Sequence, residues 1–175
     1  MSIKQLNATY VADEDRVQFR FTTVADEEFR LWLTRAVTVQ ILWGSEQLVV
    51  KALEQVHAPS QAQMIAEFKQ QSVKQNTPFH QQFQSAAKLP LGEAPLLVKK
   101  VEMRLEDAMH VLAMHLSNGQ VLTLRLTEDL LSKLAALLQK ISETARWGLQ
   151  DVAALAPAKP APVPASPGDA GPLLH

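Results

Sequence analysis

Apolar and polar residues alternate along three short stretches near the N-terminus, which is the pattern of half-buried β-strands. These stretches are residues 6–12 (LNATYVA), 17–23 (VQFRFTT) and 27–34 (EEFRLWLT). In the last stretch Phe29, Leu31 and Leu33 share one face of the predicted strand, because side chains alternate between the faces of a sheet. After Thr34 the apolar spacing becomes helical, so the pattern predicts three strands followed by a helix.

The same order of elements is predicted in the second half of the chain. Alternating strands cover residues 96–105, 110–117 and 120–127, and Asn118-Gly119 between the last two is typical of a hairpin turn. Thr127 is a suitable N-cap for the next helix, because its hydroxyl can accept a hydrogen bond from an exposed amide. The apolar stripe of this helix consists of Leu130, Leu134, Leu137, Leu138 and Ile141.

The two halves can be aligned with each other. Residues 8–46 match residues 101–139 without a gap at a constant offset of 93 positions, which places Tyr10 on Met103 and Phe19 on Leu112. We therefore expect an α+β fold of two duplicated β-β-β-α units, each an antiparallel meander followed by a helix that packs on one face of the sheet. The predicted units span about residues 3–56 and 96–149 of a single globular domain, residues 1–150.

The helix of the first unit has an unusual centre. Gly44 and Ser45 stand where the second helix has Leu137 and Leu138. Small residues at these positions indicate either a close crossing with another element or a break, with Ser45 capping a second segment that runs to about Val56.

A connector helix and a tail complete the organisation. Residues 60–75 are predicted to form an amphipathic connector helix, with Met64, Ile65 and Phe68 on its apolar face. Residues 151–175, called the tail below, are rich in proline and alanine and are expected to be disordered. The tail ends in GPLLH, which we interpret either as a docking peptide or as an ordinary terminus.

Composition narrows the classes of function. The chain has no cysteine, which excludes disulfides, thiolate metal sites and a cysteine nucleophile. Its start lacks the apolar core of a signal peptide, and no apolar run is long enough for a membrane span, so a cytoplasmic protein is expected. The formal net charge is −1, so a nucleic acid or an acidic membrane would have to be bound by a local basic patch.

Catalytic and metal-binding patterns are weak. The histidines form no H-x-x-x-H pair, and His110 and His115 should point to opposite faces of one strand. The acidic clusters at residues 13–15, 26–28 and 106–107 fall in predicted turns, where such residues favour the turn itself. We therefore expect no enzymatic activity, no metal and no cofactor.

A row of polar and aromatic side chains is the best candidate binding site. If Phe21 pairs with Phe29, the outer face of the first hairpin carries Arg20 opposite Arg30 and Gln18 opposite Trp32, with Arg16 extending the row. Trp32 is then a suitable cation–π partner for an arginine. This outer row, together with Arg125 of the second unit, is either a ligand surface or a structural stack.

The corresponding positions of the second unit are apolar. Met109, Val111 and Ala113 would form an apolar row on the outer face, and such a row is usually covered. We expect the connector helix or another subunit to cover it, and by analogy the outer row of the first unit is a candidate for burial too.

Two resemblances accompany these residues. The hairpin DRVQFRFTT…EEFRLWLTR resembles the opening of a family of uncharacterised bacterial proteins with an RLWLTRR-like strand-to-helix segment, with Ala36 in place of the second arginine. This resemblance implies a bacterial cytoplasmic protein. The duplicated meander-plus-helix arrangement is similar to that of PC4-like and Whirly-type proteins, which implies single-stranded DNA binding by a sheet face.

The sequence thus predicts a non-enzymatic binding or assembly module that recognises a protein partner, or a second copy of itself as a homo-oligomer, through a sheet face and the tail. The binding residues would be Arg16, Arg20, Arg30, Trp32 and Arg125. The alternative is single-stranded nucleic-acid binding, with stacking on Trp32 and phosphate contacts from the arginines.

Overall fold

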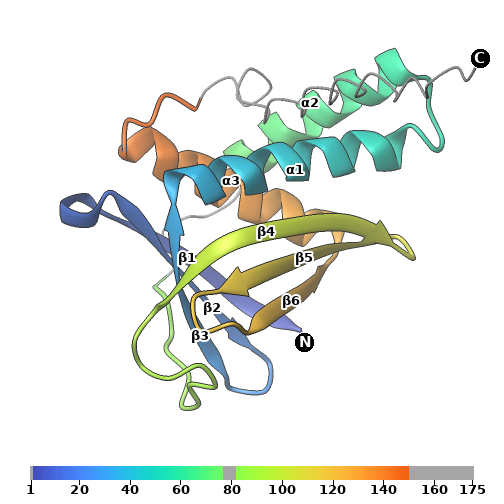
Figure 1. The fold of residues 1–175 in the computed structure, drawn as a ribbon. Coiled ribbons are helices and arrows are strands. Elements are labelled where there is room, and N and C mark those ends of the chain that lie inside the picture. Colours follow the sequence, from blue (N-terminus) through green and yellow to red (C-terminus); the bar gives the residue numbers. More distant parts are fainter. Residues whose placement is uncertain (1, 77–81, 150–175) are drawn as a thin grey trace, which may run out of the picture.

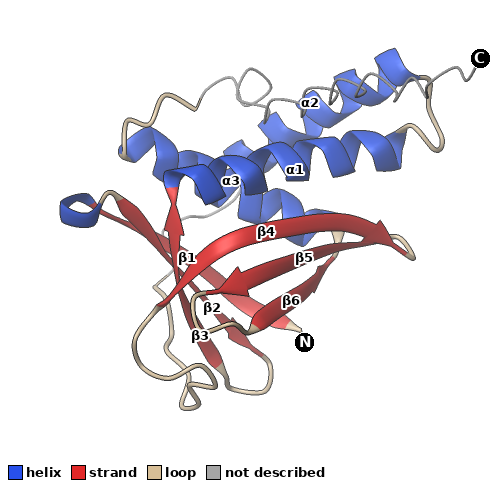
Figure 2. Ribbon diagram, in the orientation of Figure 1, coloured by secondary structure: helices blue, strands red, loops and turns tan. Residues whose placement is uncertain are grey.

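The computed structural model describes residues 2–76 and 82–149 and has an α+β fold (Figures 1 and 2). Three strands and a helix occur on each side of a connector helix, as predicted. The elements are β1 (Ile3–Val11), the short 3-10 helix η1 (Ala12–Glu14), β2 (Arg16–Thr23), β3 (Glu28–Thr34), α1 (Arg35–Leu53), α2 (Pro59–Asn76), β4 (Leu96–Glu106), β5 (Met109–Leu116), β6 (Val121–Leu126) and α3 (Glu128–Thr144).

All six strands belong to one mixed sheet in the order β1-β2-β3-β4-β5-β6. Each set of three strands is antiparallel, and the two sets join where β3 and β4 run parallel through the pairs Leu31–Leu96 and Trp32–Leu97. The three helices lie together on one side of this curved sheet (Figure 2). The parallel joint has no local sequence signal, because it unites residues more than sixty positions apart.

The core lies between the helices and the inner face of the sheet. The strand parity predicted for the first unit is confirmed, since Phe29, Leu31 and Leu33 are all buried on this face. Phe21 and Phe29 stack with ring centroids 4.8 Å apart. Burial of these apolar side chains is the main favourable contribution to folding.

The registers of the two meanders agree at β2–β3 and β5–β6 but differ at the first hairpin. Phe19 pairs with Leu31 as Leu112 pairs with Leu124, which preserves the offset of 93. In the first strands, however, Tyr10 pairs with Val17 and Leu105 pairs with His110, so the offset there is 95 and the alignment of Tyr10 with Met103 is wrong. The difference arises because the chain needs residues 12–15 to turn into β2 but only residues 107–108 to turn into β5.

Threonine caps begin both long helices. The Thr34 hydroxyl accepts a hydrogen bond from the Val37 amide, and the Thr127 hydroxyl accepts one from the Leu130 amide, each at 3.3 Å. Helix α1 continues without a break through Gly44, so the interpretation as a close crossing is right and the predicted break is wrong. Helix α1 packs on β4 and α3 packs on β1, so each helix contacts the first strand of the opposite half.

The connector helix α2 packs on α1 and α3 rather than on the sheet. Its buried positions are Ala62 and Ala66, which cluster with Leu53, whereas Met64 and Phe68 are 63% and 73% exposed. The predicted apolar face is therefore wrong for Met64 and Phe68 and right for Ile65, which packs against the alanine cluster. None of the helices in the described part of the chain is both long and apolar enough to cross a membrane. The tail with its GPLLH segment lies outside the described residues.

Candidate recognition surfaces on the sheet

The outer row of the first unit has the geometry predicted from strand parity. Arg20 pairs with Arg30, Gln18 with Trp32 and Arg16 with Thr34 across β2 and β3. Residues 82–95, called the strap below, lead from α2 to β4 and make the contacts with this row that are described next.

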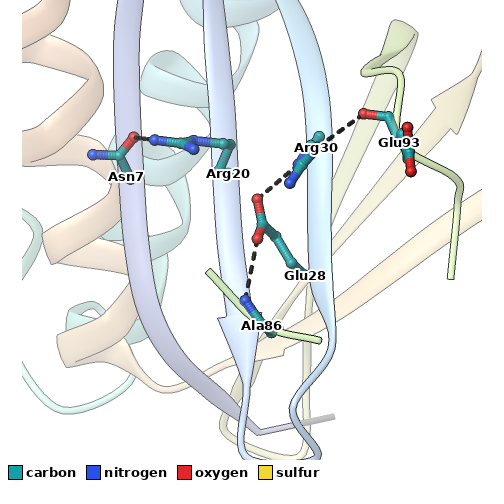
Figure 3. A network of polar contacts seen from close by, with 6 residues as sticks. All are labelled: Asn7, Arg20, Glu28, Arg30, Ala86 and Glu93. Carbon is teal, nitrogen blue, oxygen red and sulfur yellow. Dashed lines mark hydrogen bonds and ion pairs between the residues drawn. The ribbon is translucent and has the colours of Figure 1, made fainter. Parts of the chain in front are cut away.

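Arg30 is held by groups from the strap and from its own strand (Figure 3). Its Nε donates to Glu28 Oε1 at 2.7 Å, and its Nη1 donates to the carbonyl of Glu93 in the strap at 3.1 Å. The Glu28 carboxylate is fully buried, and its other oxygen accepts from the Ala86 amide at 3.2 Å. A buried charge needs such partners, so this ion pair anchors the strap to the sheet.

The electrostatics of Glu28 reflect the same contacts. Burial by itself would raise the pKa of the Glu28 carboxyl, but the hydrogen bonds from Arg30 and Ala86 and the charges of Arg30 and Arg20 bring this pKa below its ordinary value. Glu28 correspondingly raises the pKa of Arg30. The pair therefore stays ionised at neutral pH.

Arg20 also has partners within the chain (Figure 3). Its Nη2 donates to Asn7 Oδ1 at 3.1 Å, and its guanidinium lies 4.4 Å from the centroid of the Phe83 ring in the strap. The sequence predicted Trp32 as the cation–π partner of an arginine, but the partner of Arg20 is Phe83, because the strap places this ring directly over the guanidinium. Sequence reasoning missed this contact, since Phe83 lies outside both β-β-β-α units.

The remaining predicted residues are spread over the sheet. Trp32 is half-buried where β3 meets β4, and Arg16 forms an ion pair with Glu14 at 3.4 Å. Arg125 lies on β6, in the other half of the sheet, with an exposed side chain. The structure therefore brings Arg20, Arg30 and the strap together but does not join Arg125 to them.

The outer face of β4–β6 is different, and we call it the open face. Val111 and Ala113 at its centre are only 1% and 5% exposed, although they lie outside the main core cluster. Val111 pairs with Arg104 on one side and Arg125 on the other, so long flanking side chains shield it. The expected cover by the connector helix is wrong, since α2 packs on the other helices.

Charged and polar side chains form the surface of the open face. Those exposed to solvent are Lys100, Glu102, Arg104, Thr123 and Arg125, with Glu106 and His115 partly exposed. Opposite charges pair within this set: Lys100 Nζ lies 2.6 Å from Glu102 Oε1, and Glu106 contacts both Arg104 and Arg125. Hydrogen bonds from Lys100 and Arg104 lower the pKa of Glu102 and Glu106, respectively. The open face is therefore a ladder of alternating charges above a small apolar floor.

The two strand histidines point to opposite faces, as predicted. His110 is 2% exposed on the inner face, its Nδ1 makes no hydrogen bond, and burial lowers its pKa while the charge of Glu128 acts in the opposite direction. His115 lies on the open face near Glu102. Within the described residues, no group of three or more histidine and carboxylate side chains has a metal-binding arrangement.

One further depression lies among the helices, where α1, α2 and α3 meet. It is open to solvent, and its lining includes Leu42, Ala66, Leu131 and Ala135. Glu67, Lys69 and Gln70 stand among its lining side chains. The small side chains of Ala66 and Ala135 in this lining are the sequence signal that could have indicated a hollow here.

Comparison of the chain with protein families, with curated proteins and with solved structures gave no match.

Proposed function

We propose that this chain is a non-enzymatic cytoplasmic binding module that recognises another protein through the open face of β4–β6. The observation that carries the proposal is the contrast between the two outer faces of one sheet. The strap contacts Arg20, Glu28 and Arg30 on the first, whereas the charged side chains of the second are exposed. The second face can offer these side chains to a partner without moving part of the chain.

The chemistry of the open face favours a protein partner. Lys100 and Arg104 alternate with Glu102 and Glu106, so the face has both signs of charge in a fixed order. A protein surface with the complementary order can match such a pattern, and charge complementarity of this kind mainly supports specificity and the rate of association. The carboxylates of Glu102 and Glu106 would repel a polyanion such as a nucleic acid.

The nucleic-acid alternative depends on the outer row of the first unit, and the contacts of that row support it less. Arg30 already bonds to Glu28, and Phe83 covers Arg20. Phosphate binding by these arginines would compete with a buried carboxylate and would displace the strap. The row supports a structural role in holding the strap.

We further infer that the two β-β-β-α units are copies of one ancestral unit. The second and third strands and the helix of each unit begin 93 positions apart, at Arg16 and Met109, Glu28 and Val121, and Arg35 and Glu128. Both first strands also have a register irregularity at a lysine, between Ile3 and Gln5 and between Val98 and Lys100. In this view the strap evolved to cover one outer face, which left recognition to the other.

A capture experiment with the full chain tests the proposed function. The unchanged protein and each variant are immobilised and incubated with an extract of host cells. The variants are the charge reversals Arg104→Glu and Arg125→Glu on the open face and Lys51→Glu, an exposed control on α1. We expect at least one bound protein that both open-face variants lose and the control retains. Light scattering on the same samples detects a second copy as the partner. If all variants bind the same proteins and none alters self-association, the proposal is wrong.

A titration separates the nucleic-acid alternative. The full chain is mixed with a labelled single-stranded oligonucleotide in low salt, where phosphate contacts are strongest. The proposal predicts no binding that depends on Arg30 and Trp32. Salt-sensitive binding that is lost in Arg30→Ala and Trp32→Ala would favour the alternative.

A further inference from the structure

Strand β6 is an edge of the sheet whose backbone has one unused side. Among the described residues it pairs with β5 alone. An edge strand presents unpaired amide and carbonyl groups and is a template for an added strand. The side chains of Val121, Thr123 and Arg125 are exposed along this strand.

The corresponding strand of the first unit shows which kind of segment fits such an edge. Strand β3 pairs with β2 in the same register as β6 pairs with β5. The other side of β3 receives the start of β4 in parallel, with Leu96 beside Leu31 and Leu97 beside Trp32. Leu96 packs against the core, so this short joint contributes both backbone pairing and apolar burial.

The segment that enters this joint has a recognisable sequence, GEAPLL, residues 92–97. Gly92 has a φ of +88°, which favours glycine, and it turns the chain toward the sheet. The Glu93 carbonyl accepts from Arg30, and Pro95 restricts the chain just before the leucines pair. Each residue type of the segment therefore has a role in delivering two leucines to the edge of β3.

A closely similar segment, GDAGPLL, occurs at residues 168–174 of the tail. The two segments share glycine, an acidic residue, alanine, proline and two leucines in the same order, with Gly171 inserted before the proline. The first follows the helix of unit one and the second follows the helix of unit two. Only the first lies within the described residues.

We propose that the tail adds a parallel strand to the free edge of β6 in its own molecule, with Leu173 beside Leu124 and Leu174 beside Arg125. The offset of 93 between β3 and β6 sets this register, because Leu124 and Arg125 correspond to Leu31 and Trp32. Leu173 then faces the core side, where Leu124 is buried, and Leu174 faces the open side.

The tail has the length that this docking needs. Leu149, the last described residue, is buried, and 24 positions separate it from Leu173. An extended proline-rich chain advances about 3.1 Å per residue, so a chain of this length can span about 70 Å. A domain of this size has a radius of gyration of about 15 Å, so every part of the edge is within reach. An intramolecular site also has a high effective concentration, which favours the molecule's own tail over that of a neighbour.

Docking would affect the open face without depending on its proposed role. Leu174 would lie next to Arg125, one of the exposed cations of that face. A partner that binds the open face would then either compete with the docked tail or contact the tail and the face at the same time. The docking itself is testable whether or not such a partner exists.

Cysteine pairs test the register, because the chain contains no cysteine of its own. Neighbouring strands lie about 4.8 Å apart, which suits a disulfide. We expect the double variant Arg125→Cys/Leu174→Cys to form an intramolecular disulfide at least ten times faster than the control Val24→Cys/Leu174→Cys. Val24 is exposed and lies in the turn between β2 and β3. Equal rates, or disulfide-linked dimers from the first pair in dilute solution, would overturn the proposal.

Amide hydrogen exchange of the full chain gives an independent test without any cross-link. We expect the β6 amides to exchange about tenfold faster in the variant Leu173→Asp/Leu174→Asp than in the unchanged chain. Val163→Asp, a tail substitution outside the GDAGPLL segment, should leave exchange as it was. Identical exchange of β6 in all three proteins would contradict docking, and exchange that slows only at high protein concentration would assign the edge to the tail of another molecule.

Discussion

At Gly44, helix α1 passes so close to β4 that a Cβ atom at this position would lie 2.7 Å from Met103 Sδ. The matching position of α3 is Leu137, and the register of the first strands matches Met103 with Ala8. The contact of α1 with β4 thus combines glycine in the helix with methionine in the strand, whereas the equivalent positions of α3 and β1 hold leucine and alanine. The two helix–strand pairs distribute side-chain volume differently.

This relationship predicts a coupled pair of substitutions. Gly44→Leu should destabilise the protein by about 2 kcal/mol or more, because the added side chain overpacks the contact with Met103. Met103→Ala in the same chain should restore part of that loss, since it pairs leucine in the helix with alanine in the strand, as at the equivalent positions Leu137 and Ala8. Urea unfolding of the two single variants and the double variant measures the coupling. Strictly additive losses would contradict the prediction.

The ion pair beneath the strap predicts a large effect of one neutral substitution. Glu28→Gln should lower the free energy of unfolding by about 2–3 kcal/mol, because Arg30 and the Ala86 amide lose a buried charged acceptor. The matched substitution Glu102→Gln affects an exposed carboxylate and should change stability by less than about 0.5 kcal/mol. Similar effects of both substitutions would show that the strap is not anchored by Glu28.

The same carboxylate predicts part of the acid sensitivity. Folding lowers the pKa of Glu28, so the folded protein binds fewer protons than the unfolded chain. The stabilisation is present above the unfolded pKa of about 4.3 and is lost as the pH falls through the lower folded pKa. Unfolding free energies between pH 6 and pH 3 should therefore fall less steeply in Glu28→Gln than in the unchanged chain.

His110 predicts a second pH dependence, at higher pH. Burial lowers its pKa in the folded state, so its neutral form is favoured, and stability should decline as the pH falls below the unfolded value of about 6.5. The matching position in β2 is Val17, which is fully buried. His110→Val should reduce the stability difference between pH 8 and pH 5.5, whereas the exposed control His57→Gln should leave it unchanged.

The packing of α2 predicts that its exposed large apolar residues contribute less to the stability of the protein than its buried alanines. Phe68→Gln should change the free energy of unfolding by less than about 0.5 kcal/mol, since the side chain is exposed. Ala62→Leu should cost about 1–3 kcal/mol by overpacking the contact with α1, because Ala62 is fully buried. Thermal unfolding of both variants checks the order, and a larger loss for Phe68→Gln would place that side chain in an interface.

Residues that act through local interactions were predictable from the sequence. The alternation of Phe29, Leu31 and Leu33 indicated which face is buried, and that face is in the core. Thr127 was recognisable as a cap, because a cap bonds to an amide three residues away. The pairing of Arg20 with Arg30 followed from the expected pairing of Phe21 with Phe29 across the first hairpin.

The features that decide the candidate sites depend on contacts between distant segments. Nothing near Arg20 in the sequence indicates that Phe83 covers it, and nothing near Glu28 indicates that Ala86 bonds to it. For the same reason the spacing of Met64 and Phe68 suggested a buried helix face that the packing of α2 leaves exposed.

The sequence by itself thus determined the strands, their inward and outward faces and the helix starts, because alternation and capping act over a few residues. Only the tertiary structure decided that the outer face of β1–β3 lies under the strap while that of β4–β6 is open. The two outer faces differ in exposure according to where a distant segment packs, and the stability of that packing is a property of the whole fold.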